Sequence, residues 1–385
     1  MHFYCHLEYW ELNLDNTSTK KIAIITTLNH NIGDDFVREG IKYLLKEKLG
    51  DNISFSNIHK HSPITTRNFF EIIKSRRISN IIDSIIPIKW TRDKIIEADI
   101  VVQSGAPVYW CHKSNESHCC NNEWYKPLIK NRFLRYTKSA KLLNLAAGSC
   151  QKYNSDGSEF CEKCNDYIKE FYKISSVTTL RDSLAKDIFS QIDIKSNVLP
   201  CSSIFAIDEY GLSDSGSEYI VLNYMKGGAH YTFGQNIDFK KWELEFSKFY
   251  FEIKKYERVI FSCHNKQEVD LVMKFDPEAE IFYKKNDYLA YMKFYSKAKF
   301  GIMNRVHGAF LISSFGKPSL IIGNDSRAKM ADEIGLKNYF VNDVSYDILM
   351  QEYKYLNSGA DNYKERFRII KEKAYKNYMK ELSIL

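Results

Sequence analysis

Four cationic or protonatable side chains follow two successive apolar strands of a predicted C-terminal sheet. Arg305 and His307 come after the first of these strands, and Arg327 and Lys329 come after the second. Open α/β sheets bind ligands at the carboxyl ends of their strands, and the helices that start there favour an anion at their free N–H groups. The pattern therefore predicts a site for a negatively charged group. A structural role for His307 is the alternative, because Arg-x-His is a short pattern.

Each pair of residues lies in the same local pattern of strand, tight turn and helix. We expect strands over 300–303 and 319–322, with polar turns over 304–308 and 323–327. A helix over 309–315 follows the first turn, and another helix follows the second. Glycines in the two turns allow a close approach of the backbone. Motif matches gain weight when this strand–turn–helix context accompanies them.

Two further candidates follow strand ends elsewhere in the chain. Arg181 comes after a predicted strand over 176–180, and its guanidinium could hold a carboxylate or a phosphate with two hydrogen bonds. The alternative for Arg181 is a solvated ion pair with its neighbour Asp182. His264 follows a predicted strand over 258–263 and is a further candidate for the site.

The thiols are concentrated between residues 111 and 164, and the chain holds nine cysteines in all. An odd number makes a complete disulfide framework unexpected. Only Cys161 and Cys164 have the spacing of a metal knuckle, and a second matching pair is missing. A structural zinc could tie the loop after Trp110 to the loop after Gly148. We favour reduced thiols, because the Cys-x-x-Cys pair stands alone.

Length and charge limit the classes of protein to consider. A chain of 385 residues exceeds the usual size of one core, and 44% hydrophobic residues argue against disorder. The net charge of +7 suits a small acidic substrate or an anionic membrane surface but is too diffuse to require nucleic acid. No targeting or membrane-spanning run is evident. We therefore expect a cytoplasmic protein, with at most peripheral contact at the inner face of the membrane.

The alternation of apolar strands and amphipathic helices predicts two Rossmann-like α/β domains. We expect an N-terminal leader over 1–19, a first domain over 20–206, a second domain over 218–345 and C-terminal helices over 346–385. The acidic, Gly- and Ser-rich stretch over 207–218 is the expected linker. The last helix either crosses back to the first domain, lies solvated on the surface, or rests on an anionic membrane.

Several of these segments resemble one known family. The runs Arg305-Val306-His307-Gly308-Ala309, Gly316-Lys317-Pro318 and Gly323-Asn324-Asp325-Ser326-Arg327-Ala328-Lys329-Met330 are similar to the C-terminal signature of polysaccharide pyruvyl transferases. Asn31-Ile32-Gly33-Asp34 and Thr179-Leu180-Arg181-Asp182 look like the family's N-terminal landmarks. The resemblance implies a GT-B-like fold, with two Rossmann-like domains facing each other across a cleft. It also implies transfer of a pyruvyl ketal from phosphoenolpyruvate to a saccharide acceptor, which could be lipid-linked.

This chemistry assigns roles to the basic turns. Phosphoenolpyruvate is a multiply charged anion, and Arg181, Arg305, Arg327 and Lys329 are suited to hold it. Its methylene carbon must accept a proton while a sugar hydroxyl attacks the adjacent carbon. His307 is the candidate general acid, because its charge changes near neutral pH. No metal or other cofactor is needed for the reaction.

The first domain would bind the acceptor. Asp34 or Asp35 could orient or deprotonate a sugar hydroxyl, as the family's Gly-Asn-x-Gly-Asp loop implies, or either could simply cap the helix that follows. Relatives often carry three glycines after the strand over 98–103, whereas this chain keeps only Gly105. Tyr109, with Trp110, could instead offer a stacking face to a sugar ring.

Two rival functions use the same residues. A nucleotide-sugar glycosyltransferase with a GT-B fold would hold a diphosphate in the basic turns. A glycan-binding protein that has lost its chemistry is the second rival, suggested by the reduced glycine turn.

Overall fold

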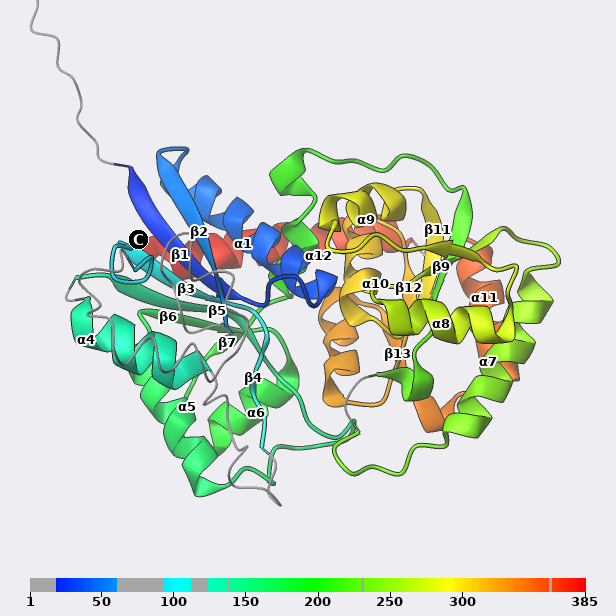
Figure 1. The fold of residues 1–385 in the computed structure, drawn as a ribbon, viewed down its shortest axis with the longest axis horizontal. Helices are drawn as coiled ribbons and strands as arrows, with labels where there is room; N and C mark the ends of the chain where they lie inside the picture. The colour runs from blue at the N-terminus through cyan, green and yellow to red at the C-terminus, as the bar shows by residue number, and fades with distance from the viewer. Residues whose placement is uncertain (1–18, 61–92, 112–123, 138, 230–231, 360–361) are drawn as a thin grey trace, which may run out of the picture.

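The computed structural model describes residues 19–60, 93–111, 124–137, 139–229, 232–359 and 362–385. Within these ranges the chain forms two parallel β-sheets, each flanked by helices, that stand next to each other (Figure 1). Most of the expected leader (1–19) and residues 61–92 of the expected first domain lie outside the described residues. So do Cys119 and Cys120.

The first sheet contains seven strands, and every pairing in it is parallel. Its order is β2-β1-β3-β5-β6-β7, with β4 pairing on β5. The strands are β1 (Lys20–Thr26), β2 (Ile53–His59), β3 (Ile100–Ser104), β4 (Pro107–Tyr109), β5 (Lys141–Ser149), β6 (Val177–Leu180) and β7 (Asn197–Val198).

The second sheet contains six strands, again all parallel, in the order β10-β9-β8-β11-β12-β13. This is the strand order of a Rossmann fold. The strands are β8 (Tyr219–Asn223), β9 (Val259–Ser262), β10 (Glu280–Phe282), β11 (Ala298–Met303), β12 (Ser319–Gly323) and β13 (Lys337–Phe340). The two parallel sheets confirm the predicted α/β fold class.

Helices connect the strands, as parallel pairing requires. In the first half these are α1 (Ile32–Leu49), a π-helix (Tyr125–Phe133) continued by α4 (Leu134–Tyr136), α5 (Glu162–Ile174) and α6 (Ser183–Gln191). In the second half they are α7 (Phe239–Ile253), α8 (Lys266–Phe275), α9 (Tyr288–Tyr295), α10 (Val306–Ser314), the 3-10 helix η8 (Ser326–Ile334), α11 (Tyr346–Asn357) and α12 (Tyr363–Glu381). The helix expected from residue 309 thus begins three residues earlier, at Val306.

The central strands are buried on both faces, which explains their unbroken apolar runs. In β1, Ile22 and Ile24 belong to the same hydrophobic cluster as Phe36 of α1, whereas Ala23 and Ile25 belong to the cluster that holds the buried side chains of α5 and α6. Successive side chains of a strand point to opposite faces, so one run of four residues serves two cores.

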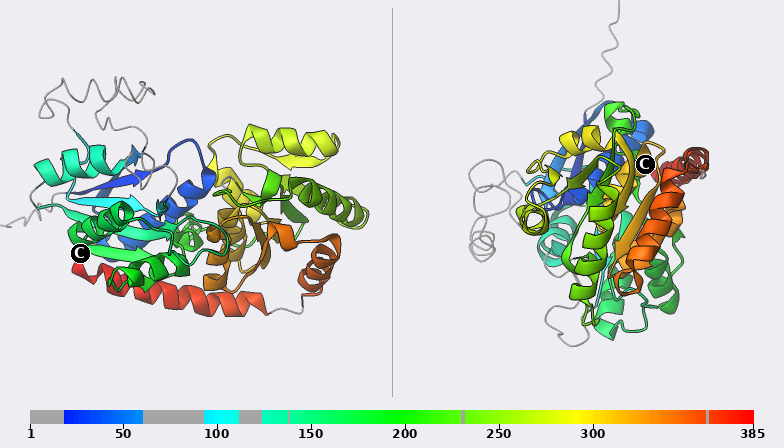
Figure 2. Two further views of the ribbon diagram at one scale, coloured as in Figure 1. Left: turned by 90° about the horizontal axis from the view of Figure 1, so that it is seen from below. Right: turned by 90° about the vertical axis from the view of Figure 1, so that its right-hand side faces the viewer.

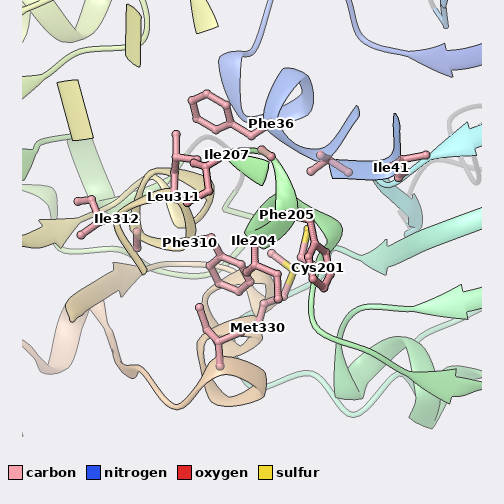
Figure 3. Packing of buried hydrophobic residues seen from close by; sticks show 14 of the residues in the cluster. Phe36, Ile41, Cys201, Ile204, Phe205, Ile207, Phe310, Leu311, Ile312 and Met330 are labelled. Atoms are coloured by element: carbon pink, nitrogen blue, oxygen red, sulfur yellow. The ribbon is translucent and has the colours of Figure 1, made fainter. Parts of the chain in front are cut away.

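One hydrophobic cluster joins the two halves. Phe36 of α1 and Phe205, from the 3-10 helix Ser202–Phe205, belong to the first half. Phe310 of α10 and Met330 of η8 belong to the second. Figure 3 shows these side chains gathered between the two sheets. Because they are fully or almost fully buried, the halves share a core and hold a fixed relation to each other.

The C-terminal helix α12 crosses back to the first half. It runs along both halves in the left view of Figure 2. Its buried Tyr378 donates a hydrogen bond to the carbonyl of Pro200 at 2.9 Å, and Tyr375 donates to Glu47 on α1 at 2.8 Å. Of the three arrangements expected for this helix, the structure adopts the crossing. Among the described helices, none combines the length and hydrophobicity required to cross a bilayer.

Candidate active site

Each sheet has one point at which its strand order reverses. A ligand crevice forms outside the carboxyl ends of the strands where the strand order reverses. In the second sheet this point lies between β8 and β11, and in the first sheet it lies between β1 and β3. Both points open into one cavity of about 450 Å³. Its wall includes Thr27, which follows β1, and Asn304, which follows β11.

The cavity collects most of the residues singled out from the sequence. Its lining includes Asp34 and Arg181 from the first half, and His264, Arg305, His307 and Arg327 from the second. Lys60 also lines it, and the carboxylates among the lining residues are Asp34 and Asp325. Four permanent cations against two carboxylates leave the wall positive, as the binding of an anion requires.

Arg181 and His307 meet across the cleft. Nη1 of Arg181 lies 3.3 Å from Nε2 of His307, and Arg181 has no solvent exposure. Arg181 follows β6, and His307 lies in the first turn of α10. Asp182 does not pair with this guanidinium. Instead its carboxylate caps α6 and accepts from Ser149. The ion pair considered for Arg181 and Asp182 is therefore wrong.

This contact fixes the state of the imidazole. A guanidinium can only donate, so Nε2 of His307 accepts and carries no proton. Burial, reinforced by the positive charges of Arg181 and Arg327, holds the pKa of His307 well below its usual 6.5. His307 is thus neutral at physiological pH in the ligand-free protein.

Two glycines make room for these side chains. A Cβ on Gly33, in the first turn of α1, would lie 2.6 Å from Nδ1 of His307. A Cβ on Gly148, in β5, would lie 2.4 Å from Nε of Arg181. The Asn-x-Gly-Asp segment therefore contributes a close approach to the histidine as well as a carboxylate. The two turn glycines, Gly308 and Gly323, have a different role. A Cβ there would meet the side chains of Met303 and Ala328, so these glycines allow packing within the second half.

Arg305 is held by a buried carboxylate behind it. It forms an ion pair with Glu268 of α8, whose other oxygen accepts from Asn223 at 3.0 Å and from the backbone of His264 at 2.9 Å. Burial acts to raise the pKa of Glu268, but Arg305 and His264 outweigh it and the pKa is lowered. The carboxylate therefore stays charged. It orients Arg305 toward the cavity and offsets part of its charge.

Arg327 is held in a similar way by its own turn. Asp325 caps η8 through the backbone N–H of Arg327 and accepts two hydrogen bonds from the guanidinium, at 2.8 and 2.6 Å. Next to it, Ser326 exchanges two 3.0 Å hydrogen bonds with the backbone of Gln151 in the first half. The start of η8 is thus already capped by a carboxylate, and the Arg327 side chain held by this turn lines the cavity.

The two acidic residues of α1 have different surroundings. Asp34 lines the cavity, whereas Asp35 forms a buried ion pair with Arg38. Burial raises the pKa of Asp35 to about 6, against the opposing effect of Arg38. Neither residue caps the helix, because the cap is Asn31, whose side chain accepts from Gly33. The alternative that Asp34 or Asp35 caps the helix is therefore wrong, and Asp35 does not share the position of Asp34.

Three other expected site residues lie away from the cavity lining. Tyr109 is 1% exposed, and its hydroxyl accepts from Asn144 at 2.7 Å, so it cannot stack on a sugar. Gly105 packs against the carbonyl of Ala146, where a Cβ would lie 2.5 Å away. Lys329 lies over the ring of Tyr153 at 5.3 Å. These three assignments are corrected by burial and by packing.

Lys60 and Glu268 were missed by sequence reasoning. Lys60 directly follows β2, so its position at a strand end was a signal that could have been used. Glu268 is the third residue of α8 and exchanges hydrogen bonds with the N-cap residue Asn265. This local role gives no sign of its ion pair with the distant Arg305.

A third thiol lies beside the Cys-x-x-Cys motif in the structure. Cys111 lies with Cys161 and Cys164, and the three sulfur atoms are all within 4.8 Å of one another. Cys111 comes from the loop after β4, far from the other two in sequence.

Two parallel sheets with facing crevices, closed by a C-terminal helix that returns to the first half, define a GT-B-like fold. The positive cavity between them suits an enzyme that acts on an anionic substrate. The sequence matches the family described as polysaccharide pyruvyl transferase over residues 31–326, and the chain belongs to this family of transferases.

Solved structures agree with the fold. One is described as an S. aureus MnaA-UDP co-structure; it has a TM-score of 0.53 and 14% identity, and the match covers 90% of each chain. Another is a putative UDP-N-acetylglucosamine 2-epimerase from Listeria monocytogenes. It has a TM-score of 0.53 and 12% identity, with 91% of this chain and 90% of that chain covered. Among curated proteins, no relative matches the sequence.

Proposed function

We propose that this protein transfers a pyruvyl group from phosphoenolpyruvate to two hydroxyls of a saccharide, forming a cyclic ketal. The observation that carries the proposal is the set of cations that both halves direct into one cavity: Arg181 from the first half, with Arg305 and Arg327 from the second. A small, multiply charged anion is the ligand that such a site favours. Family membership supports the same substrate class.

The reaction needs a proton that the free enzyme does not hold on His307. An anion bound beside the imidazole stabilises its charged form and opposes the effect of the arginines. We expect the carboxylate or the phosphate of phosphoenolpyruvate to draw the Arg181 guanidinium away from Nε2, and His307 then takes up a proton. The proton passes to the methylene carbon, which becomes the methyl group of the product.

The acceptor supplies the rest of the chemistry. As the methylene carbon is protonated, a sugar hydroxyl forms a bond to the adjacent carbon and gives up its proton, for which Asp34 is the carboxylate in the cavity. A second hydroxyl then attacks the same carbon, and phosphate leaves with its bonding electrons and that hydroxyl's proton. Fixed cations near the departing phosphate stabilise the negative charge that develops on it.

The test is phosphate release from phosphoenolpyruvate in the presence of a panel of free and lipid-linked saccharides, with mass analysis of the acceptor. Release that depends on an acceptor, together with a ketal-bearing product, supports the proposal. Thermal stabilisation by nucleotide sugars and not by phosphoenolpyruvate would instead favour a glycosyltransferase. Binding of saccharides without any phosphate release would favour a glycan-binding protein.

A further inference from the structure

Three cysteine thiols meet where β4 ends and α5 begins. Cys161 is the residue before α5, and Cys164 lies in the first turn of that helix. Cys111 follows β4 and comes from a different part of the chain. All three sulfur atoms lie within 4.8 Å of one another, and those of Cys161 and Cys164 are 3.5 Å apart. Cys111 is 4% exposed and Cys164 is fully buried.

This spacing matches a metal centre. Zinc–sulfur bonds of about 2.3 Å in a tetrahedron place neighbouring sulfurs about 3.8 Å apart. The 3.5 Å between Cys161 and Cys164 is close to that value and far from the roughly 2.05 Å of a disulfide bond. Thiolates also select zinc over the hard cations magnesium and calcium. We propose that Cys111, Cys161 and Cys164 bind a zinc ion as thiolates.

Zinc binding requires each of the three thiols to lose its proton. Each thiol gives its proton to solvent as its sulfur bonds to the metal, so zinc uptake releases protons. The helix supports this change for Cys161 and Cys164, because the positive end of its dipole favours a thiolate. The three thiols account for three positions of the tetrahedron.

The site has a structural consequence for the cavity wall. The carbonyl of Cys111 accepts a hydrogen bond from Nε2 of Gln151 at 3.0 Å, and the backbone of Gln151 is bonded in turn to Ser326, next to Arg327. Pro107, the first residue of the strand β4 that precedes Cys111, lines the cavity. The zinc therefore braces the first half where it meets the turn that carries Arg327. None of the three cysteines is among the residues that line the cavity.

The test is the metal content of the full chain, purified without added metal or chelator. We expect about one zinc per chain that survives dialysis. Cys111→Ser and Cys164→Ser should lower the zinc content to background. Cys263→Ser, which alters a buried thiol in the second half, should leave it unchanged. Equal zinc content in all three variants and the wild type would overturn the proposal.

A second measurement covers variants that fail to fold. Removal of the metal from the wild-type chain with a chelator should lower its melting temperature, and added Co²⁺ should restore it with a thiolate-to-cobalt charge-transfer band. A wild-type chain that holds no zinc and gives no such band with Co²⁺ would refute the site. So would a Cys161–Cys164 disulfide in freshly purified protein that persists when zinc is supplied.

Discussion

Arg181 and His307 are joined by a contact of 3.3 Å although they belong to opposite halves of the molecule. Since the guanidinium donates, the contact assigns the imidazole as an acceptor and keeps it neutral. Neither half contains this arrangement alone. The proposed acid is therefore inactive until a ligand changes its surroundings, and this leads to the first two predictions.

His307→Gln should lower turnover strongly and leave substrate binding largely intact. General acid catalysis contributes about 10²- to 10⁴-fold, so kcat should fall by at least about a hundredfold. The dissociation constant of phosphoenolpyruvate should stay within about tenfold, because the arginines that hold it remain. Steady-state kinetics and calorimetric titration check the two values separately. Near-normal turnover would remove His307 from the mechanism.

Binding of phosphoenolpyruvate near pH 7 should take up a proton at His307. The folded pKa lies below 6.5 in the free protein, so His307 enters the complex neutral, and the bound anion raises its pKa. Titration calorimetry in buffers of different ionisation enthalpy measures the uptake. The substrate's own phosphate also titrates, so His307→Gln serves as the reference. Equal uptake by the wild type and the variant would show that the bound anion does not protonate His307.

Arg327→Gln should weaken binding of phosphoenolpyruvate, whereas Lys329→Gln should not. A charge-assisted hydrogen bond contributes about 1.5–3 kcal/mol, which corresponds to a loss of about 10- to 100-fold in affinity. Lys329 is a matched control, because it lies two residues away in the same 3-10 helix but over the ring of Tyr153. Calorimetric titration of both variants gives the comparison. An equal loss in both would mean that only net charge matters.

Gly33→Ala should lower activity, whereas Gly105→Ala should lower stability. The new Cβ at residue 33 would press on Nδ1 of His307, so we expect about a hundredfold loss of kcat from misplacement of the imidazole. Stability should change by no more than about 1 kcal/mol there, because alanine favours the helix. At residue 105 the Cβ meets the carbonyl of Ala146, so overpacking should cost about 1–3 kcal/mol in the free energy of unfolding. Kinetics and urea denaturation of both variants test this contrast.

Tyr378→Phe should destabilise the protein by about 1–2 kcal/mol, because the carbonyl of Pro200 loses its buried donor. Tyr375→Phe is the control: its hydroxyl bonds Glu47 at an exposed position, where a change of less than about 0.5 kcal/mol is usual. Urea denaturation gives both values. Equal effects would mean that the buried bond of α12 does not contribute to its attachment.

The part of the site that could be predicted from the sequence is the part that depends on strand ends. Arg181, His264, Arg305 and His307 each follow a predicted apolar strand closely, and the carboxyl ends of parallel strands meet at one edge. The structure brings all four to the cavity. Their mutual contacts depend on how the halves pack.

Neighbouring residues of similar type were harder to separate. Asp34 and Asp35 differ by about 100° around α1, so one faces the cavity and the other pairs with Arg38. Arg327 and Lys329 diverge in the same way on a helix of about three residues per turn. In each pair the two side chains carry the same charge, so the local sequence does not show which one faces the cavity. Only the direction of each side chain in the folded structure does.

The sequence by itself determined the fold class, because strand and helix periodicity and the apolar runs of the doubly buried strands are local properties of the chain. Only the tertiary structure decided that Gly33 approaches His307, that Glu268 stands behind Arg305 and that Cys111 joins Cys161 and Cys164. Each of these contacts connects residues far apart in the chain. Such contacts follow from how complete elements pack, and no short stretch of sequence carries that information.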